Sequence, residues 1–532
     1  MPTSFFAKER LTWECNLVIM YKKRAIRDER SHKEDNFMKR MLALLCAMLM
    51  LTSAVACGKT EPSETTAAAT TAASGDATTA APEATTPAET EPPKAFDSVP
   101  AQNLGGTFHI LYSTTDQSLA DFTAETQNGD IKNDLIFTRN TMVEEKLGVD
   151  VTISPMGYTD LNTECQRQVQ AGTNDYDMFG GHRNSLVLSY QGFHYDLLDI
   201  STLDLTQEWW DQNYVNAITI NDSLYTVIGD IGVSTLLFVS SLTFNKKLMD
   251  EQNMAYPYDL VRDGKWTMDA LLTMTADYGE DLNGDGALTR DNDRLAMVGW
   301  STESGYSLFY GSGFAFINRD AAGDPVLEYD SDKLVNVLEK TLDIWLRDNV
   351  FIFTDATSGT EHQKTYGVFA EGRALFSDIV LSKIGTFYSA MEDDYGILPC
   401  PKYTEDQNKY SAYLGYTIPI LFLASNVQDP ERNGTIMEAL CTASYDNVTP
   451  EMYEIVTKLK NVRDEDSSEM IEIIIRNKYI DTAHFYNIAG YGTIPRDVIV
   501  NKTGNIASVL KSYERIASKE WDKILEDFDK IS

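Results

Sequence analysis

One short stretch has the spacing of oxygen-bearing side chains that is typical of calcium loops. In Asp281–Asp293 (DLNGDGALTRDND), carboxylate or amide groups occupy the first, third and fifth positions, and a glycine occupies the sixth. Calcium prefers six to eight oxygen ligands in flexible geometry, and a glycine at the sixth position permits the sharp turn. The spacing therefore predicts a bound Ca²⁺, with these ligands from the first half of the loop: Asp281, Asn283, Asp285 and the carbonyl of Ala287.

The second half of this loop departs from the calcium pattern. Position twelve is Asn292, where an EF-hand has glutamate, and Asp291 and Asp293 flank it. We expect one or more of these three residues to complete the coordination shell. The alternative is a metal-free Asn/Gly/Asp turn held by local hydrogen bonds. A signalling role is not expected, because the sequence has no second loop to pair with this one.

The composition and the missing motifs exclude several classes of function. The chain has 80 Asp and Glu against 45 Lys and Arg, so it would repel nucleic acid. The nucleophile elbow, HExxH, the phosphate-binding P-loop and CxxC do not occur. The 532 residues suffice for two or three domains, and a hydrophobic content of 43% allows large cores.

The N-terminal region has the pattern of an export signal. Met38 is followed by two basic residues, an apolar run to Leu51 and the small residues 53–56, just before Cys57. This predicts a signal peptide over 38–56, because the run is too short to span a membrane. AVAC (54–57) is similar to the bacterial lipoprotein signal, in which the cysteine carries the lipid. Since Ala54 stands where leucine is usual, ordinary cleavage and release is the alternative. Residues 1–37 are interpreted as a non-native extension.

A low-complexity segment follows the signal. Residues 57–103 are rich in Thr, Ala, Pro and Glu, and we expect a disordered tether between a lipid anchor and the folded part. A span of roughly 35 Å is expected for such a chain of 40 residues. Three cysteines remain beyond it, and their wide spacing predicts buried thiols rather than a disulfide framework: Cys165, Cys400 and Cys441.

The folded part begins with alternating strand and helix patterns. Strands are expected at 106–113, 149–155 and 175–182, separated by helices over 134–147 and 161–171. This alternation indicates a parallel α/β sheet. Two long apolar, β-rich runs follow at 223–230 and 234–245, and the last hundred residues are expected to be mostly helical.

Six stretches, in order, resemble the extracellular solute-binding proteins of bacterial ABC importers, the family that includes sugar binders. They are EWWDQNYVNAITINDSLYTVIGD (208–230), LTFNKKLMDE (242–251), VRDGKWTMDALL (261–272), FAEGRALF (369–376), YGILPCPKYTEDQNKY (395–410) and SSEMIEIIIRNKYID (467–481). Each motif alone is weak, but their order and spacing match over roughly 104–525. Calcium-type loops without an EF-hand helix pair recur in this family, where the metal is structural.

The resemblance implies a type II periplasmic-binding-protein fold, in which two discontinuous α/β lobes are joined by hinge strands and hold ligand between them. The implied first lobe comprises 104–243 and 396–445, and the second comprises 244–395 and the helical 446–532. Hinge closure around the ligand would create the form that an ABC permease recognises.

The resemblance also places candidate ligand contacts around the cleft. In the first lobe these are His182, Arg183, one of Trp209 and Trp210, Asp230, and the loop with Thr114, Thr115 and Asp116. In the second lobe they are Trp300 and Tyr306, in a loop-like stretch, and Ser377 and Asp378 after FAEGRALF. Aromatic rings would stack on sugar faces, and polar groups would bind hydroxyls.

These features together predict a lipid-anchored, monomeric receptor on the outer face of the cytoplasmic membrane, delivering a mono- or oligosaccharide to an ABC importer. The expected partners are the sugar and the permease subunits, with the membrane reached only through the anchor. A surface glycosidase or lyase with two carboxylates is the alternative. A peptide or metal-chelate binder of the same fold is also compatible with the sequence.

Overall fold

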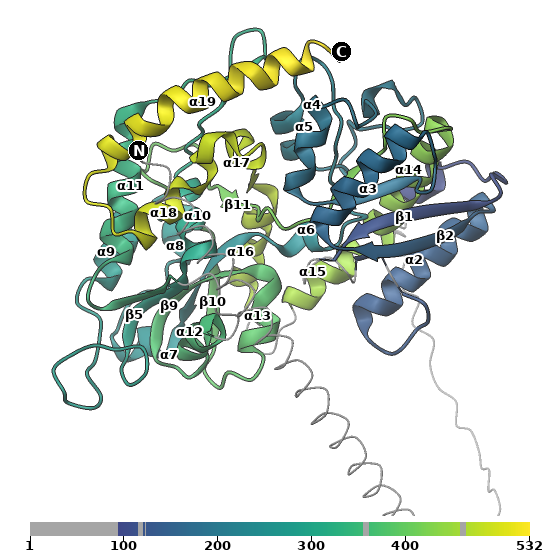
Figure 1. Ribbon diagram of the computed structural model, residues 1–532. Coiled ribbons are helices and arrows are strands. Elements are labelled where there is room, and N and C mark those ends of the chain that lie inside the picture. The colour runs from purple at the N-terminus through teal and green to yellow at the C-terminus, as the bar shows by residue number, and fades with distance from the viewer. Residues whose placement is uncertain (1–93, 115–120, 123, 355–360, 458–463, 532) are drawn as a thin grey trace, which may run out of the picture. The chain divides into compact units, whose positions relative to one another are not determined.

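The computed structural model describes residues 94–114, 121–122, 124–354, 361–457 and 464–531 (Figure 1). The chain divides into Met1–Glu89 and Thr90–Ser532, and every described residue belongs to the second unit. The predictions for 1–37, for the signal 38–56, for Cys57, and for Thr115 and Asp116 lie outside the described residues. Within the described ranges, no helix is both long and apolar enough to cross a membrane.

The first sheet has four strands in the order β12-β3-β1-β2. They are β1 (Thr107–Ser113), β2 (Asp150–Met156), β3 (Met178–Gly181) and β12 (Ile420–Phe422). β1 pairs in parallel with β2 and β3, and β12 runs antiparallel to β3. The connecting helices are α2 (Ile131–Leu147) and α3 (Tyr158–Ala171). The predicted strand–helix alternation is therefore confirmed, with a distant strand added at the sheet edge.

The helix α2 shows why these boundaries form. Asp130 caps its start by accepting the backbone N–H of Asn133, and Gly148 ends it in the left-handed region at φ 59°. A side chain at Gly148 would also bring its Cβ to 2.5 Å from Asn103 Oδ1. Because the helix ends in this tight turn, β2 begins only two residues later, at Asp150.

The second sheet has five strands in the order β10-β4-β9-β5-β8. They are β4 (Ser240–Asn245), β5 (Leu295–Trp300), β8 (Val350–Phe353), β9 (Ala374–Val380) and β10 (Tyr395–Leu398). β4 runs antiparallel to β9 and β10, whereas β5 is parallel to β8 and β9. Every residue of the central strand β9 is buried, as expected where both faces of a sheet are covered.

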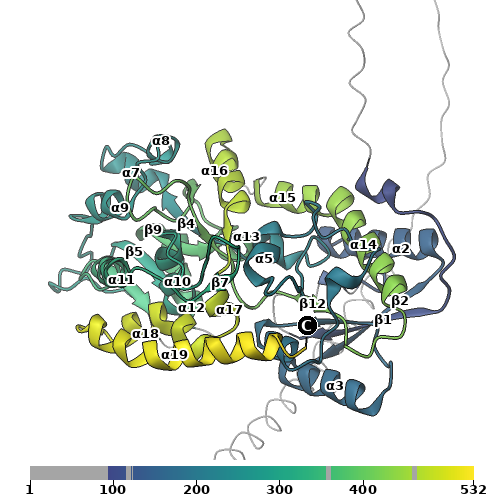
Figure 2. The ribbon, with the colours of Figure 1, turned by 90° about the horizontal axis from the view of Figure 1, so that it is seen from above.

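Helices pack on both sheets and connect them (Figure 2). α10 (Ser301–Gly311) and α12 (Glu361–Ala370) lie against the second sheet, and α16 (Glu465–Arg476) lies against β10. α14 (Pro430–Asn447) packs on α2, and α15 (Thr449–Thr457) contacts α14, α16 and α13 (Leu381–Tyr388). α15 therefore continues from a helix of the first sheet to helices of the second.

The remaining described elements are shorter or peripheral. They are η1 (Ala95–Ser98), η3 (Arg183–Leu186), α4 (Val187–Tyr190), η4 (Leu197–Asp199), α5 (Gln212–Ile218), α6 (Ser234–Leu237), α7 (Lys246–Glu251), α8 (Tyr258–Arg262), α9 (Met268–Thr275), β6 (Asn318–Arg319), β7 (Pro325–Val326), α11 (Ser331–Trp345), β11 (Ala412–Tyr413), β13 (Lys478–Tyr479), α17 (Thr482–Phe485), η5 (Ile488–Thr493), α18 (Ile494–Val500) and α19 (Ile506–Phe528).

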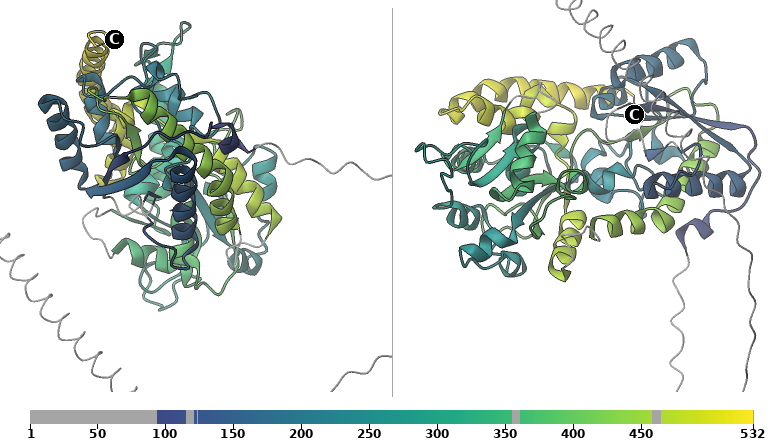
Figure 3. Two further views of the ribbon diagram at one scale, coloured as in Figure 1. Left: turned by 90° about the vertical axis from the view of Figure 1, so that its right-hand side faces the viewer. Right: turned by 90° about the horizontal axis from the view of Figure 1, so that it is seen from below.

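The C-terminal helix α19 touches elements of both lobes (Figure 3). It packs on α11 and η5, and its Phe528 ring lies 5.9 Å from Tyr190 and 5.7 Å from Tyr225. The strands β4 and β10 pair entirely within the second sheet. Because β4 (Ser240–Asn245) and β10 (Tyr395–Leu398) both belong to the second sheet, the second lobe begins before residue 244 and extends past residue 395. The last turns of α19 pack on the first lobe.

Some local structures differ from the sequence predictions. The tether was predicted to reach residue 103, but η1 is fixed because Asp446 accepts the backbone N–H groups of Ala95 (3.0 Å) and Phe96 (2.7 Å). The run 223–230 forms only isolated bridges, and the run 234–245 begins with α6 before β4. Cys165, Cys400 and Cys441 are buried free thiols, as predicted.

Candidate functional site

A cavity of about 470 Å³, here called the cleft, lies where the carboxyl ends of strands from both sheets meet. Ligand sites of α/β proteins typically form at this edge. Thr114 and Tyr158 follow β1 and β2, and Trp300 and Val380 end β5 and β9. The rest of the lining consists of Phe238, Thr302, Glu303, His362, Lys383, Tyr413, Gly415, Tyr416 and Thr417.

The charged groups of the cleft compensate one another. Glu303 Oε1 pairs with Lys383 Nζ, with side-chain exposures of 10% and 15%, and Glu303 Oε2 accepts the hydroxyl of Tyr366 at 2.8 Å. Lys383 Nζ also lies 5.1 Å from the Trp300 ring centroid. A nearly buried pair of this kind cancels its own charge, so the cleft suits a ligand without net charge.

The sequence predicts a loop at Trp300, but this residue ends β5 and directly precedes α10 as its N-cap. Its backbone N–H donates to Ser304 Oγ at 3.0 Å, and its ring stacks on His362 at 4.9 Å with an angle of 21°. The expected loop 299–307 is instead the end of β5 and the start of α10, and Gly299 packs against Trp345 too tightly for a side chain. Trp300 is thus held in a fixed position at the cleft.

Ser377 and Asp378 lie behind the cleft and do not line it. Asp378 accepts the hydroxyl of Ser304 at 3.0 Å and that of Ser307, and burial raises its pKa to about 7. Ser377 Oγ accepts the hydroxyl of Tyr388 at 2.7 Å. Asp378 therefore anchors the first turns of α10, which carry lining residues of the cleft.

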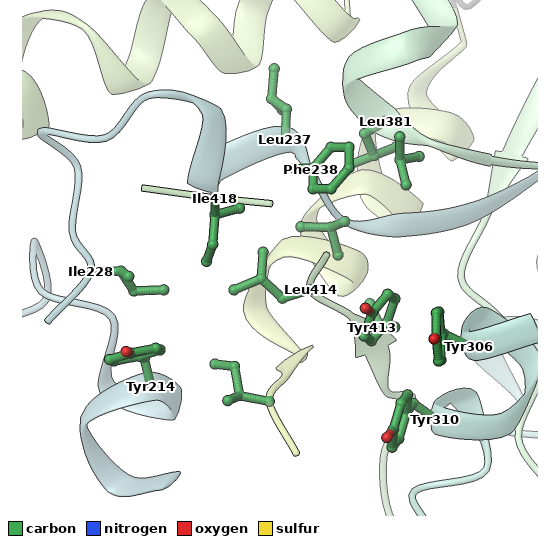
Figure 4. Packing of buried hydrophobic residues seen from close by; sticks show 14 of the residues in the cluster. Tyr214, Ile228, Leu237, Phe238, Tyr306, Tyr310, Leu381, Tyr413, Leu414 and Ile418 are labelled. Carbon is green, nitrogen blue, oxygen red and sulfur yellow. The ribbon is translucent and has the colours of Figure 1, made fainter. Parts of the chain in front are cut away.

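Tyr306, His182 and Arg183 support the cleft from beneath. The Tyr306 ring is buried, and its centroid lies 5.2 Å from that of Tyr413 and 6.4 Å from that of Tyr416. Figure 4 shows Tyr306 next to Tyr413. Arg183 lies 4.1 Å over the Tyr416 ring and donates to the carbonyl of His484 at 2.8 Å. These residues position the two tyrosines and are absent from the cleft lining.

His182 packs beside Tyr416, at 5.8 Å between ring centroids. Burial, with a smaller contribution from Arg183, lowers its pKa to about 4, so the imidazole is neutral at pH 7. It follows that His182 contributes no charge to this region.

Trp209, Trp210 and Asp230 lie away from the cleft. Both indole N–H groups donate to Glu438, at 2.8 Å from Trp209 and 2.9 Å from Trp210. Trp210 and Asp230 line a separate cavity of about 650 Å³, here called the groove. Burial raises the pKa of Asp230 to about 7, although a hydrogen bond from Thr449 and the charge of Lys478 oppose the shift.

Several cleft residues were not singled out from the sequence. They are Tyr158, Phe238, Thr302, Glu303, His362, Val380, Lys383, Tyr413, Gly415, Tyr416 and Thr417. Tyr158 could have been found, because it follows a predicted strand. The pairing of Glu303 with Lys383 has no sequence signal, since the fold brings distant segments together.

The predicted calcium loop is closed by its own hydrogen bonds. Asp281 accepts the backbone N–H groups of Gly284 and Gly286, each at 2.7 Å, and Asp293 accepts that of Leu282 at 2.9 Å. Asp291 pairs with Arg290 at 2.9 Å. Within the described ranges, no three His, Cys, Asp or Glu residues are grouped to hold a metal. This geometry favours the plain turn, and calcium binding stays a prediction.

Comparisons with known proteins identify the family. A family profile described as "Bacterial extracellular solute-binding protein" matches residues 140–469, over half of the chain. A search of curated protein sequences finds no match.

Solved structures give more distant likenesses. One is a cyclo/maltodextrin-binding protein complexed with maltotetraose (13% identity, 81% of this chain and 97% of that chain, TM-score 0.48). Another is apo RafE from Streptococcus pneumoniae (12%, 78% and 98%, TM-score 0.49). A third is an extracellular solute-binding protein from Staphylococcus aureus in complex with maltose (12%, 80% and 97%, TM-score 0.49).

The profile match runs from the second half of α2 to the first turn of α16, and so includes strands of both sheets and most residues of the cleft. The chain belongs to the family of bacterial extracellular solute-binding proteins.

Proposed function

We propose that this protein is a receptor that binds a neutral mono- or oligosaccharide in the cleft and delivers it to an ABC importer. The observation that carries the proposal is the lining of the cleft, where aromatic rings and hydrogen-bonding groups come from both sheets. The ring of Tyr158 is 45% exposed, so it can stack on the apolar face of a sugar. Thr417 offers a hydroxyl group to a bound sugar.

The balance of charge in the cleft favours a neutral ligand. Lys383 is compensated by Glu303, and no other acidic residue of the described chain lines the cleft. A glycosidase would use two carboxylates flanking the bond that it cleaves. The cleft lining therefore supports binding better than hydrolysis.

The segment at Phe238–Val239 and the segment at Leu414–Gly415 meet beside the cleft and would act as the hinge. Gly415 N–H donates to the carbonyl of Phe238 at 3.0 Å, and Val239 forms a bridge with Leu414. A Cβ on Gly415 would lie 2.0 Å from the Phe238 ring, so the contact requires glycine. Figure 4 shows Phe238 beside Leu381 among the buried residues. Rotation about these segments would close the lobes on a ligand.

Attachment to the membrane belongs to the same proposal. Cleavage before Cys57 and lipidation of that cysteine would hold a monomeric receptor at the outer face of the membrane, near its permease. Mass spectrometry of the N-terminal peptide from the producing cell tests the lipid directly. A free N-terminus at Cys57, or an uncleaved Met38, would contradict the anchor.

The binding function is tested by a thermal-shift screen against neutral glycans, followed by calorimetry and chromatography of the recovered glycan. We expect one glycan to raise the melting temperature by linkage and to be recovered intact. Stable binding of no glycan, or release of cleaved product, would contradict the proposal.

A further inference from the structure

The groove is a second cavity, built by elements that do not form the cleft. It has a volume of about 650 Å³, within the range of small-molecule sites. Its lining comes from residues 208–213 with α5, the turn at Gly229–Asp230, the end of α14, and α15 and α16. Figure 2 shows where these four helices lie. The cleft and the groove share no lining residue.

The groove has an excess of acidic side chains. Its two basic residues already have partners, since Lys478 Nζ lies 2.5 Å from Asp211 Oδ2 and Arg476 lies 3.2 Å from Glu472. Three further acids line the cavity: Glu208, which accepts the hydroxyl of Tyr445, Glu454, which also has a partner, and Asp230, whose carboxylate borders the cavity. A ligand of this groove should therefore carry positive charge.

Asp230 is the most deeply placed of these acids, with 9% exposure. Thr449 Oγ1 donates to its Oδ2 at 2.7 Å, and no donor from the described residues reaches Oδ1. Oδ1 is not among the fully buried atoms that lack a partner, so it opens onto the groove. A cationic donor bound in the groove would reach this oxygen.

The rest of the lining suits an organic cation better than a hydrated metal ion. The aromatic residues Trp210, Tyr445 and Tyr453 and the aliphatic Ile471 and Ile475 contribute apolar surface. Aromatic faces attract ammonium groups, and apolar walls favour an alkyl chain. Carboxylate and aromatic surface thus occur in one cavity.

We propose that the groove binds a small organic amine, with its ammonium group on Asp230 and its alkyl body against Tyr453 and Ile471. The site is independent of the sugar cleft, and nothing in the proposed receptor function requires it. The probes are cadaverine, putrescine and choline, with 1,5-pentanediol as the uncharged match to cadaverine.

The test is isothermal calorimetry on the full chain at pH 8. We expect at least one amine to bind with one-to-one stoichiometry, and the diol to bind at least about tenfold more weakly. Failure of all three amines to bind at millimolar concentration would overturn the proposal, as would equal binding of the diol.

Three variants locate the site. Asp230→Asn should weaken amine binding by about tenfold or more, and Tyr453→Leu by about threefold, because each removes one charged or aromatic contact. Glu451→Gln is the matched control, since Glu451 is exposed on the same helix α15 and lies outside the groove lining. It should change nothing.

The variants also separate specific binding from general attraction to an acidic protein. If Asp230→Asn does not fold, Tyr453→Leu decides the question. Binding that Glu451→Gln weakens as much as Tyr453→Leu, or that neither Asp230→Asn nor Tyr453→Leu weakens, would refute an amine site in the groove.

Discussion

The cleft and the groove are both lined by aromatic and acidic side chains, yet they differ in how their charges are compensated. In the cleft, Glu303 pairs with Lys383 and accepts a hydroxyl from Tyr366. In the groove, Lys478 is paired with Asp211, while Asp230 accepts from Thr449 alone among the described residues. The comparison teaches that the pairing of the charged side chains in a cavity indicates the class of its ligand better than the types of residue that line it.

The largest expected effect comes from breaking the compensation in the cleft. Lys383→Met leaves Glu303 without its partner and should lower the free energy of unfolding by about 3 kcal/mol, because a nearly buried carboxylate loses its counter-charge. Chemical denaturation at pH 7 measures this loss.

The matched control is the double variant Lys383→Met with Glu303→Gln, which removes both charges. It should recover most of the lost stability. If the single variant is as stable as the unchanged protein, the pair does not compensate the cleft as described.

A second prediction concerns the sugar contact. Trp300→Ala should weaken glycan binding by about 30-fold, equal to about 2 kcal/mol, because a fixed aromatic residue of the lining is lost. Calorimetry with the glycan found in the screen measures it. Trp209→Ala is a control outside both linings, and affinity that falls equally in the two variants would argue against the cleft.

A third prediction uses the pKa of Asp230, which burial raises to about 7 from an ordinary value near 3.8. Between these values the folded protein binds the proton more tightly than the unfolded chain, so this group's stabilisation is lost as pH rises toward 7. Asp230→Asn should therefore gain about 2 kcal/mol of stability relative to the unchanged protein between pH 5 and pH 8.

Denaturation at several pH values checks this gain. The groups acting on Asp230 besides burial are Thr449, Lys478, Asp211 and Glu208. Because Asp378 and Glu438 also have pKa values raised to about 7, only the difference between the variant and the unchanged protein isolates Asp230. A constant difference across this pH range would contradict the assignment.

The smallest expected effect is that of calcium. If the loop binds Ca²⁺ despite its complete set of hydrogen bonds, a tenfold excess over the dissociation constant adds about 1.4 kcal/mol. Asp281→Asn should remove that gain, and Mg²⁺ should not reproduce it. No change in melting temperature with millimolar Ca²⁺ would establish the loop as a metal-free turn.

Local pattern predicted the first sheet well, because β1, α2, β2 and α3 are consecutive and each has its own apolar periodicity. The prediction was wrong where one short segment contains two kinds of secondary structure. The run 234–245 contains both a short helix and a strand, and residues 299–307 contain both a strand end and a helix start. Tertiary packing, such as that of Gly299 on Trp345, decides these boundaries.

The candidate site was predicted less completely. Among the predicted ligand residues in the described ranges, Thr114 and Trp300 line the cleft. Tyr306 and Arg183 support Tyr416, Asp378 anchors α10, and Asp230 lies in the groove. Proximity to a strand end could be inferred from sequence. The distinction between lining and supporting residues depends on side-chain packing, for which no local signal exists.

The most direct test of the central claim is calorimetric titration of a neutral glycan into the full chain, with the glycan analysed by chromatography afterwards. The account predicts one binding site, a large loss of affinity in Trp300→Ala, unchanged affinity in the presence of an amine that binds the groove, and intact glycan at the end. Glycan that binds equally well to Trp300→Ala, that competes with this amine, or that is recovered cleaved would contradict it.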